Sequence, residues 1–147
     1  MNTVPEALGA AKPILFVCLH GSAKSVIAAE YFNRFAAARG LAARAESAGV
    51  EPDANVPPAV IAGLAADGID VENYAPRQVT AERLAGSDYV VSFGCDLRAM
   101  VAGMTPSQQW DDLPMVSDGF AAARDAIVAR VRPLVDAWSG LSERGSG

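Results

Sequence analysis

The sequence contains only two cysteines, Cys18 and Cys95, and one histidine, His20, among 147 residues. Two thiols far apart in the chain are too few for the disulfide framework of a small secreted domain. No stretch reaches the roughly 18 uninterrupted apolar residues that a membrane-spanning helix requires. The first residues also lack the charged start and apolar run of a signal peptide. We therefore expect a cytoplasmic protein that does not insert into a membrane.

Runs of lysine and arginine are also missing, and the formal net charge is −5. Because no basic patch with interleaved aromatic residues is present, nucleic acid is not an expected partner. Internal repeats and linkers are absent as well. With 51% hydrophobic residues, the chain is long enough to form one domain with a sizeable core. We place this domain at residues 13–138, between mobile tails at 1–12 and 139–147.

What the sequence does have is an alternation of short apolar runs and helical apolar stripes. This pattern predicts an α/β domain with a four-stranded parallel sheet and helices on both faces. The expected strands are residues 13–18, 43–48, 89–93 and a short edge strand at 109–113. The expected helices are 24–39, 57–66, about 80–85 and a last one capped by Ser117.

The last predicted helix has an apolar stripe that should face the core: Phe120, Ile127, Val131, Leu134, Val135 and Trp138. Pro133 within it predicts a kink or an early weakening. Residues 94–108 have no clear period, and we expect them to be irregular or weakly helical.

Residues 18–25, Cys-Leu-His-Gly-Ser-Ala-Lys-Ser, connect the first strand to the first helix. A thiol at the end of a buried strand, before a loop of small residues that leads into a helix, lies where backbone N–H groups converge on an anion. The positive end of the helix should favour the thiolate of Cys18, the form that attacks phosphorus or arsenic. Lys24 supplies a cation within the loop, and Ser25 could donate a hydrogen bond to the sulfur.

This loop resembles that of the low-molecular-weight protein tyrosine phosphatases and of the arsenate reductases that share their fold, whose signature is Cys, five residues, Arg and Ser. The resemblance continues in the same order through residues 45–52 (Ala-Glu-Ser-Ala-Gly-Val-Glu-Pro), 67–70 and 88–92, and it covers roughly residues 13–138. The later blocks look closer to the arsenate reductases. The resemblance implies a Rossmann-like fold and an anion site at Cys18, with neither a cofactor nor a metal ion.

Two loop positions differ from the family pattern. Lys24 stands where the family has arginine, and a compact ammonium cannot reproduce the bidentate grip of a guanidinium on two oxygens. Gly21 stands where the family has asparagine, so positive φ is easily adopted but a side-chain hydrogen bond is lost. We expect the loop to keep its shape, to lack one polar brace and to stabilise a transition state less well.

The chain also lacks the Asp-Pro pair that supplies the family's proton donor to the leaving oxygen. The matching region is residues 109–118, where Met115 falls at the usual acid position. Asp112 and Asp111 are the nearest substitutes, and Asp118 is the third. Adjacent carboxyl groups can raise one another's pKa into a useful range, but they could equally be solvated loop aspartates.

Three other interpretations of the loop agree less well with the sequence. A nucleotide-binding loop of the Gly-x4-Gly-Lys-Ser type would need two glycines that are missing here. A zinc site at Cys18, His20 and Cys95 lacks a fourth ligand and a recognised spacing, and we expect His20 at the rim of the pocket. Cys18 could be only a small buried hydrophobic residue, which leaves the later resemblance unexplained.

The expected function is attack by the Cys18 thiolate on a tetrahedral oxyanion, in phosphomonoester (phosphotyrosine) hydrolysis or in arsenate reduction. The alternative is a phosphate-binding or oxyanion-binding protein with little or no turnover. Besides Lys24, the backbone amides expected to hold the anion are those of Leu19, His20, Gly21, Ser22 and Ala23.

Arsenate reduction would also need a thiol reductant. The resemblance implies a relay through further cysteines in the thioredoxin-linked reductases, and here only Cys95 is available. An external low-molecular-weight thiol or a Cys18–Cys95 disulfide would therefore be required. The other interpretation of Cys95 is a partly buried structural thiol.

Overall fold

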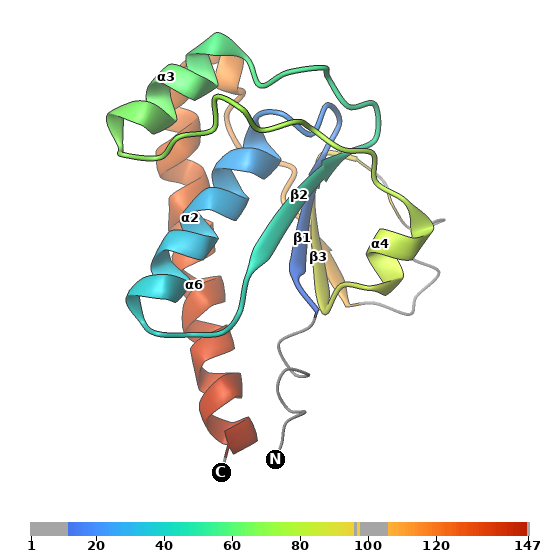
Figure 1. Cartoon of the computed structure of the whole chain (residues 1–147), viewed down its shortest axis with the longest axis vertical. Coiled ribbons are helices and arrows are strands. Elements are labelled where there is room, and N and C mark those ends of the chain that lie inside the picture. Colours follow the sequence, from blue (N-terminus) through green and yellow to red (C-terminus); the bar gives the residue numbers. More distant parts are fainter. Residues whose placement is uncertain (1–11, 96, 98–105, 147) are drawn as a thin grey trace.

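The computed structural model of the protein describes residues 12–95, 97 and 106–146. Along the chain the elements are β1 (Ile14–Cys18), α2 (Lys24–Ala38), β2 (Ala45–Gly49), α3 (Pro58–Ala66), α4 (Ala81–Ala85), β3 (Tyr89–Phe93), β4 (Ser107–Gln109), the 3-10 helix η1 (Val116–Asp118) and α6 (Phe120–Ser146) (Figure 1). The predicted tail at 1–12, apart from residue 12, and most of the predicted irregular segment 94–108 lie outside the described residues.

The four strands form one parallel sheet in the order β2-β1-β3-β4. All five residues of β1 are buried, as expected for the central strand of a parallel sheet that is covered on both faces. Cys18, the last residue of β1, pairs in register with Gly49 of β2 and Phe93 of β3. The carboxyl ends of the three strands therefore meet at one edge, where the chain enters the loop 18–25.

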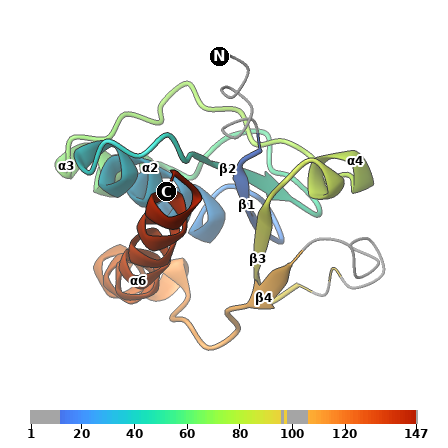
Figure 2. The same ribbon diagram turned by 90° about the horizontal axis from the view of Figure 1, so that it is seen from below.

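Helices cover both faces of the sheet, as predicted (Figures 1 and 2). Alternate residues of β1 serve two cores: Ile14 and Phe16 pack with residues of α2, α3 and α6, whereas Leu15 and Val17 pack with Leu84 of α4. The core under α2 and α6 is rich in aromatic residues, with Phe16, Phe32, Phe93, Trp110 and Trp138 in ring contact. This packing holds the start of α2 against the end of β1.

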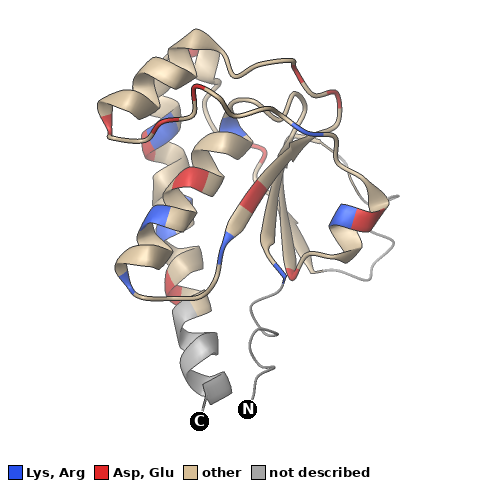
Figure 3. Cartoon of the chain, viewed as in Figure 1, with Lys and Arg blue, Asp and Glu red and all other residues tan. Residues whose placement is uncertain are grey.

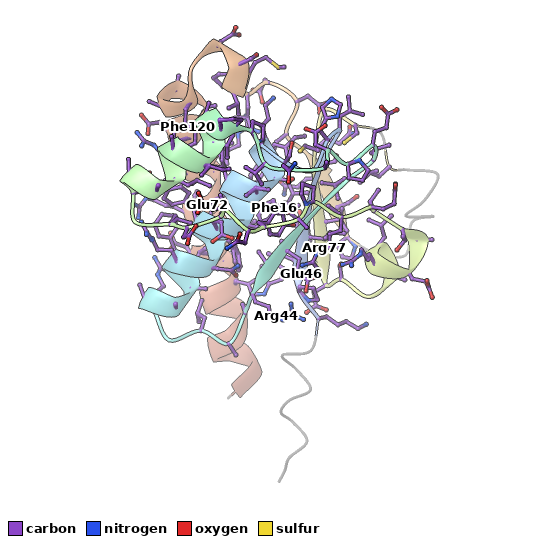
Figure 4. All side chains as sticks on the ribbon, turned by 45° about the horizontal axis from the view of Figure 1, so that its top comes forward. Phe16, Arg44, Glu46, Glu72, Arg77 and Phe120 are labelled. Atoms are coloured by element: carbon purple, nitrogen blue, oxygen red, sulfur yellow. The ribbon has the colours of Figure 1, made fainter. Side chains whose placement is uncertain are left out.

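Charged residues are interspersed along α2, β2 and α6 rather than gathered on one element (Figure 3). Arg44, just before the edge strand β2, forms an ion pair of 2.5 Å with Glu46 within that strand (Figure 4), and Arg83 of α4 lies 3.6 Å from the same carboxylate. Charges on an edge strand disfavour pairing with another chain. Within the part of the chain that the structure describes, no helix is both long enough and apolar enough to span a membrane.

Two boundaries differ from the predictions near the end of the chain. The edge strand is Ser107–Gln109, not 109–113, and the amide of Trp110 makes the last bond to β3, at Ser92 O, over 2.8 Å. The apolar residues after it, which favoured a strand, turn inward to the core: Trp110 is 4% exposed. Ser117 does not cap the last helix, because it lies in η1, and Gly119 with φ of +149° separates η1 from α6.

Helix α6 continues through Pro133 to Ser146. Val131 and Val135, which flank the proline, are fully buried, so core packing on both sides offsets the backbone hydrogen bond that proline cannot make. The boundary that the sequence places at residue 138 therefore does not coincide with the end of the helix. The mobility expected for 139–147 stays a prediction.

Candidate functional site

The thiol of Cys18 lies against the hydroxyl of Ser25. Cys18 ends β1 and is 7% exposed, and Ser25 is fully buried in the first turn of α2. The distance between Cys18 Sγ and Ser25 Oγ is 3.2 Å. A strand that ends at residue 18 and a helix that begins at residue 24 thus bring together two side chains seven positions apart, in an arrangement where the hydroxyl can donate to a thiolate.

The loop after Cys18 is held along its backbone by the segment that follows β2. Amides of that segment donate to the loop: Val50 to Cys18 O at 3.3 Å, Glu51 to Leu19 O at 2.7 Å and Asp53 to His20 O at 3.0 Å. These bonds extend the β1–β2 pairing beyond the sheet. They use carbonyl oxygens of the loop and none of its amides.

Gly21 has φ of +61°, a conformation that glycine adopts without steric cost. A Cβ at Gly21 would lie 2.6 Å from the backbone nitrogen of Gly49, and a Cβ at Gly49 would lie 2.5 Å from the nitrogen of Gly21. The two chain segments therefore touch backbone to backbone, and neither position accommodates a side chain. The family's asparagine could not be accommodated at residue 21 in this loop without a shift of the backbone at residues 48–49.

A side-chain cluster that the sequence analysis missed joins the same two segments. Ser22, 1% exposed, donates its hydroxyl to Asp53 Oδ2 at 2.7 Å. His20 Nδ1 lies 3.2 Å from Glu51 O and 3.5 Å from Asp53 Oδ1, and its ring is exposed. The signal was present in the sequence: an acidic segment that contains Glu51 and Asp53 follows the predicted strand at 43–48.

Lys24, the first residue of α2, is half-buried, and its Nζ lies 3.9 Å from Met115 Sδ. The segment before η1 thus reaches the loop, and its contact with Lys24 is made by Met115, the residue that the resemblance places at the family's acid position. The ion pairs among the described residues do not include Lys24. Leu19 and Met115, at 46% and 56%, are the exposed large hydrophobic side chains of the described chain, and both lie at this loop.

The three aspartates predicted as proton donors lie in different surroundings. Asp112 accepts a hydrogen bond of 2.6 Å from Arg130 Nη2 of α6, which orients it toward that helix. Asp111 accepts from the amide of Gly94 at 3.1 Å, at the carboxyl end of β3, and is exposed. Asp118 is exposed in η1. Asp111 is therefore the member of the set that lies at the same sheet edge as Cys18.

Cys95 is half-buried just beyond β3, and its Sγ lies 3.7 Å from Val17 O and 3.9 Å from Phe93 O. Burial raises the pKa of the Cys95 thiol, and the negative charge of Cys18 raises it further. The two free cysteines are therefore electrostatic neighbours. Across the described ranges, no three His, Cys, Asp or Glu side chains gather to form a metal site.

The chain is similar to known proteins over most of its length. The family model described as low molecular weight phosphotyrosine protein phosphatase matches residues 13–135. A Halobacterium salinarum protein named "Putative arsenate reductase" is 25% identical over 129 residues, which is 84% of this chain and 91% of that protein.

Two solved structures illustrate the shared fold. YfkJ from Bacillus subtilis superposes with a TM-score of 0.80 at 22% identity, over 91% of this chain and 98% of that one. An arsenate reductase from Archaeoglobus fulgidus superposes with a TM-score of 0.69 at 28% identity, over 84% and 98%. With a match that spans nearly all of the folded core, the chain belongs to the low molecular weight phosphotyrosine protein phosphatase family.

Proposed function

We propose that the protein is an enzyme that acts on tetrahedral oxyanions, with Cys18 as its nucleophile. The observation that carries this proposal is the 3.2 Å contact between Cys18 Sγ and the buried Ser25 Oγ, at the junction of the central strand and α2. The helix dipole and a donated hydroxyl both favour the thiolate. The same helix start presents backbone amides to an anion, so nucleophile and oxyanion site share one loop.

With a phosphomonoester, the amides of residues 19–24 and the ammonium of Lys24 hold the phosphoryl oxygens. The Cys18 thiolate attacks phosphorus in line, so an S–P bond forms as the ester P–O bond breaks and the leaving oxygen takes up a proton. Asp111 is the carboxyl group best placed to supply that proton, because Asp112 is held by Arg130. Water then attacks the phosphocysteine, which releases phosphate and restores the thiolate with help from Ser25.

Arsenate reduction is the second candidate, and the contact of Lys24 with Met115 favours it. A thioether donates no proton, but arsenate carries acidic protons of its own for the oxygen it loses as water. The Cys18 thiolate would form an S–As(V) bond in that step. A second thiol then attacks the Cys18 sulfur, the S–As electron pair passes to arsenic, and arsenite leaves with a disulfide remaining on the enzyme. The second thiol is an external thiol or Cys95, and a further thiol must reduce the disulfide.

The test compares the parent protein with Cys18→Ser and Cys95→Ser in three assays: hydrolysis of a small aryl phosphate, thiol consumption driven by arsenate, and phosphate binding by calorimetry. We expect Cys18→Ser to abolish turnover. Loss of arsenate turnover in Cys95→Ser would identify the internal thiol, whereas full activity would identify an external one. Anion binding without turnover would favour the alternative of an anion-binding protein, and an absence of both binding and turnover would refute the proposal.

A further inference from the structure

We propose that Asp53 is a positioning residue of the anion-binding loop, which acts through the hydroxyl of Ser22. This inference rests on the proposed function of the loop. Ser22 is 1% exposed and donates to Asp53 Oδ2 at 2.7 Å across 31 positions of the sequence. If the buried hydroxyl of Ser22 lost this acceptor, it would be left without a hydrogen bond at a cost in desolvation free energy. The bond therefore constrains the conformation of the loop.

The loop needs this constraint because its backbone hydrogen bonds to segment 50–53 end at His20. The backbone bonds from segment 50–53 reach Cys18, Leu19 and His20 but no residue further along the loop. The next residue, Gly21, packs against Gly49 but has no side chain that could form a hydrogen bond. The Ser22–Asp53 bond therefore ties the second half of the loop, which leads into α2, to the same segment, 50–53, that holds the first half.

Asp53 serves here as an acceptor rather than as a charge. A carboxylate beside an anion site repels the anion, although solvent screens that effect at an exposed position. Its pairing with His20 spans 3.5 Å between side chains that are 53% and 43% exposed, and such pairs contribute little. The Ser22 bond is shorter and its hydroxyl is buried. An amide in place of the carboxylate keeps the acceptor oxygen and removes the repulsion, so Asp53→Asn should preserve the function of the residue.

The role predicts a specific kinetic signature. Without the brace the free loop samples other conformations, and anion binding must order it, which weakens binding. Once the anion is bound the same amides surround it, so the chemical step changes little. We expect Asp53→Ala to raise KM and the Kd for inorganic phosphate about tenfold, with kcat within about twofold of the parent. A purely structural loss removes folded molecules, which lowers apparent kcat and leaves KM unchanged.

The experiment measures aryl phosphate kinetics, phosphate binding and thermal unfolding for Asp53→Ala, Asp53→Asn, Ser22→Ala and the Asp53→Ala/Ser22→Ala double variant. Asp70→Ala is the matched control, because Asp70 is also an exposed aspartate that accepts a local bond, from the amide of Glu72 at 2.9 Å. We expect parent-like KM for Asp53→Asn and Asp70→Ala. The double variant should lose no more affinity than either single alanine variant, because both remove one interaction.

Parent-like KM in Asp53→Ala, or additive losses in the double variant, would overturn the proposal while leaving the anion site intact. If Asp53→Ala fails to fold, Ser22→Ala and Asp53→Asn still decide it, because only the first should raise KM. A parent protein that neither binds phosphate nor turns over aryl phosphate or arsenate would instead refute the proposed function of the loop.

Discussion

Replacing Lys24 with arginine should increase turnover of phosphate esters. Lys24 begins α2 at the anion loop, and its ammonium makes a weak contact of 3.9 Å with the thioether of Met115. A guanidinium at the same place offers five donors in a planar fork that matches two oxygens of a phosphoryl group. Because Met115 is 56% exposed, it can move aside for the larger head group at little cost.

The size of the effect follows from the number of bonds gained. The bidentate fork adds about one charge-assisted hydrogen bond, worth roughly 1.5 to 3 kcal/mol if it is made in the transition state. That free energy corresponds to a gain in kcat/KM on the order of tenfold to a hundredfold. Cys18 and Ser25 contact each other independently of the Lys24 head group, so the nucleophile should be unaffected.

Steady-state hydrolysis of a small aryl phosphate by the parent, Lys24→Arg, Lys24→Ala and Cys18→Ser provides the assay. Lys24→Ala should be slower than the parent, and Cys18→Ser should be inactive. If Lys24→Arg is no faster than the parent while Cys18→Ser abolishes activity, the loop is adapted to another anion or geometry and the argument from the bidentate fork is wrong. Equal inactivity of all variants would favour the anion-binding alternative.

Three further predictions concern other residues. Since the charge of Cys18 contributes to the raised pKa of Cys95, Cys18→Ser should speed alkylation of Cys95 by iodoacetamide near pH 8, and an unchanged rate would show that Cys18 is neutral there. Met115→Asp should raise kcat/KM about tenfold for phosphate esters with poor leaving groups, whereas Met115→Leu should not; equal rates in both would exclude general acid catalysis from this position. Burial, followed by the hydrogen bond to Asp67, raises the pKa of Tyr31 to about 12. The unfolded chain therefore releases the phenolic proton first, and stability should fall between about pH 10 and 12. In urea unfolding, Tyr31→Phe should be about 1 kcal/mol less stable at neutral pH and lack this fall; parallel curves would contradict it.

The part of the site that the sequence predicts well is encoded in consecutive residues. A buried strand, a loop of small residues and an amphipathic helix determine locally that Cys18 ends the strand and that Ser25 lies in the first helical turn. The contact between the two side chains follows from that arrangement. The positive φ of Gly21 is local as well. The parallel order of the sheet follows from the alternation of apolar runs and helices.

The remaining features depend on residues that are distant in the sequence. Nothing near Asp112 in the sequence indicates that Arg130 donates a hydrogen bond to it, because Arg130 lies on a helix that begins eight residues after Asp112. The brace between Ser22 and Asp53 requires the register of β1 with β2, which places their following loops side by side. The sequence places the edge strand too late because Trp110 is apolar. In the structure Trp110 packs against Phe93 in the core just after the strand, and apolar content alone does not distinguish a strand from a loop that faces the core.

The two candidate reactions differ most in the source of the leaving-group proton. An ester oxygen must receive its proton from the protein or from water, and the group that contacts the loop cation is a thioether. Asp111, at the end of β3, already accepts from the amide of Gly94, so it must release or share that bond to act as a donor. Arsenate makes no such demand, because its own hydroxyl groups supply protons. The presence of a thioether rather than a proton donor beside Lys24 should therefore slow the hydrolysis of esters with poor leaving groups more than it slows the reaction with arsenate. For the parent protein, we expect ester hydrolysis rates to fall steeply as the pKa of the leaving group rises.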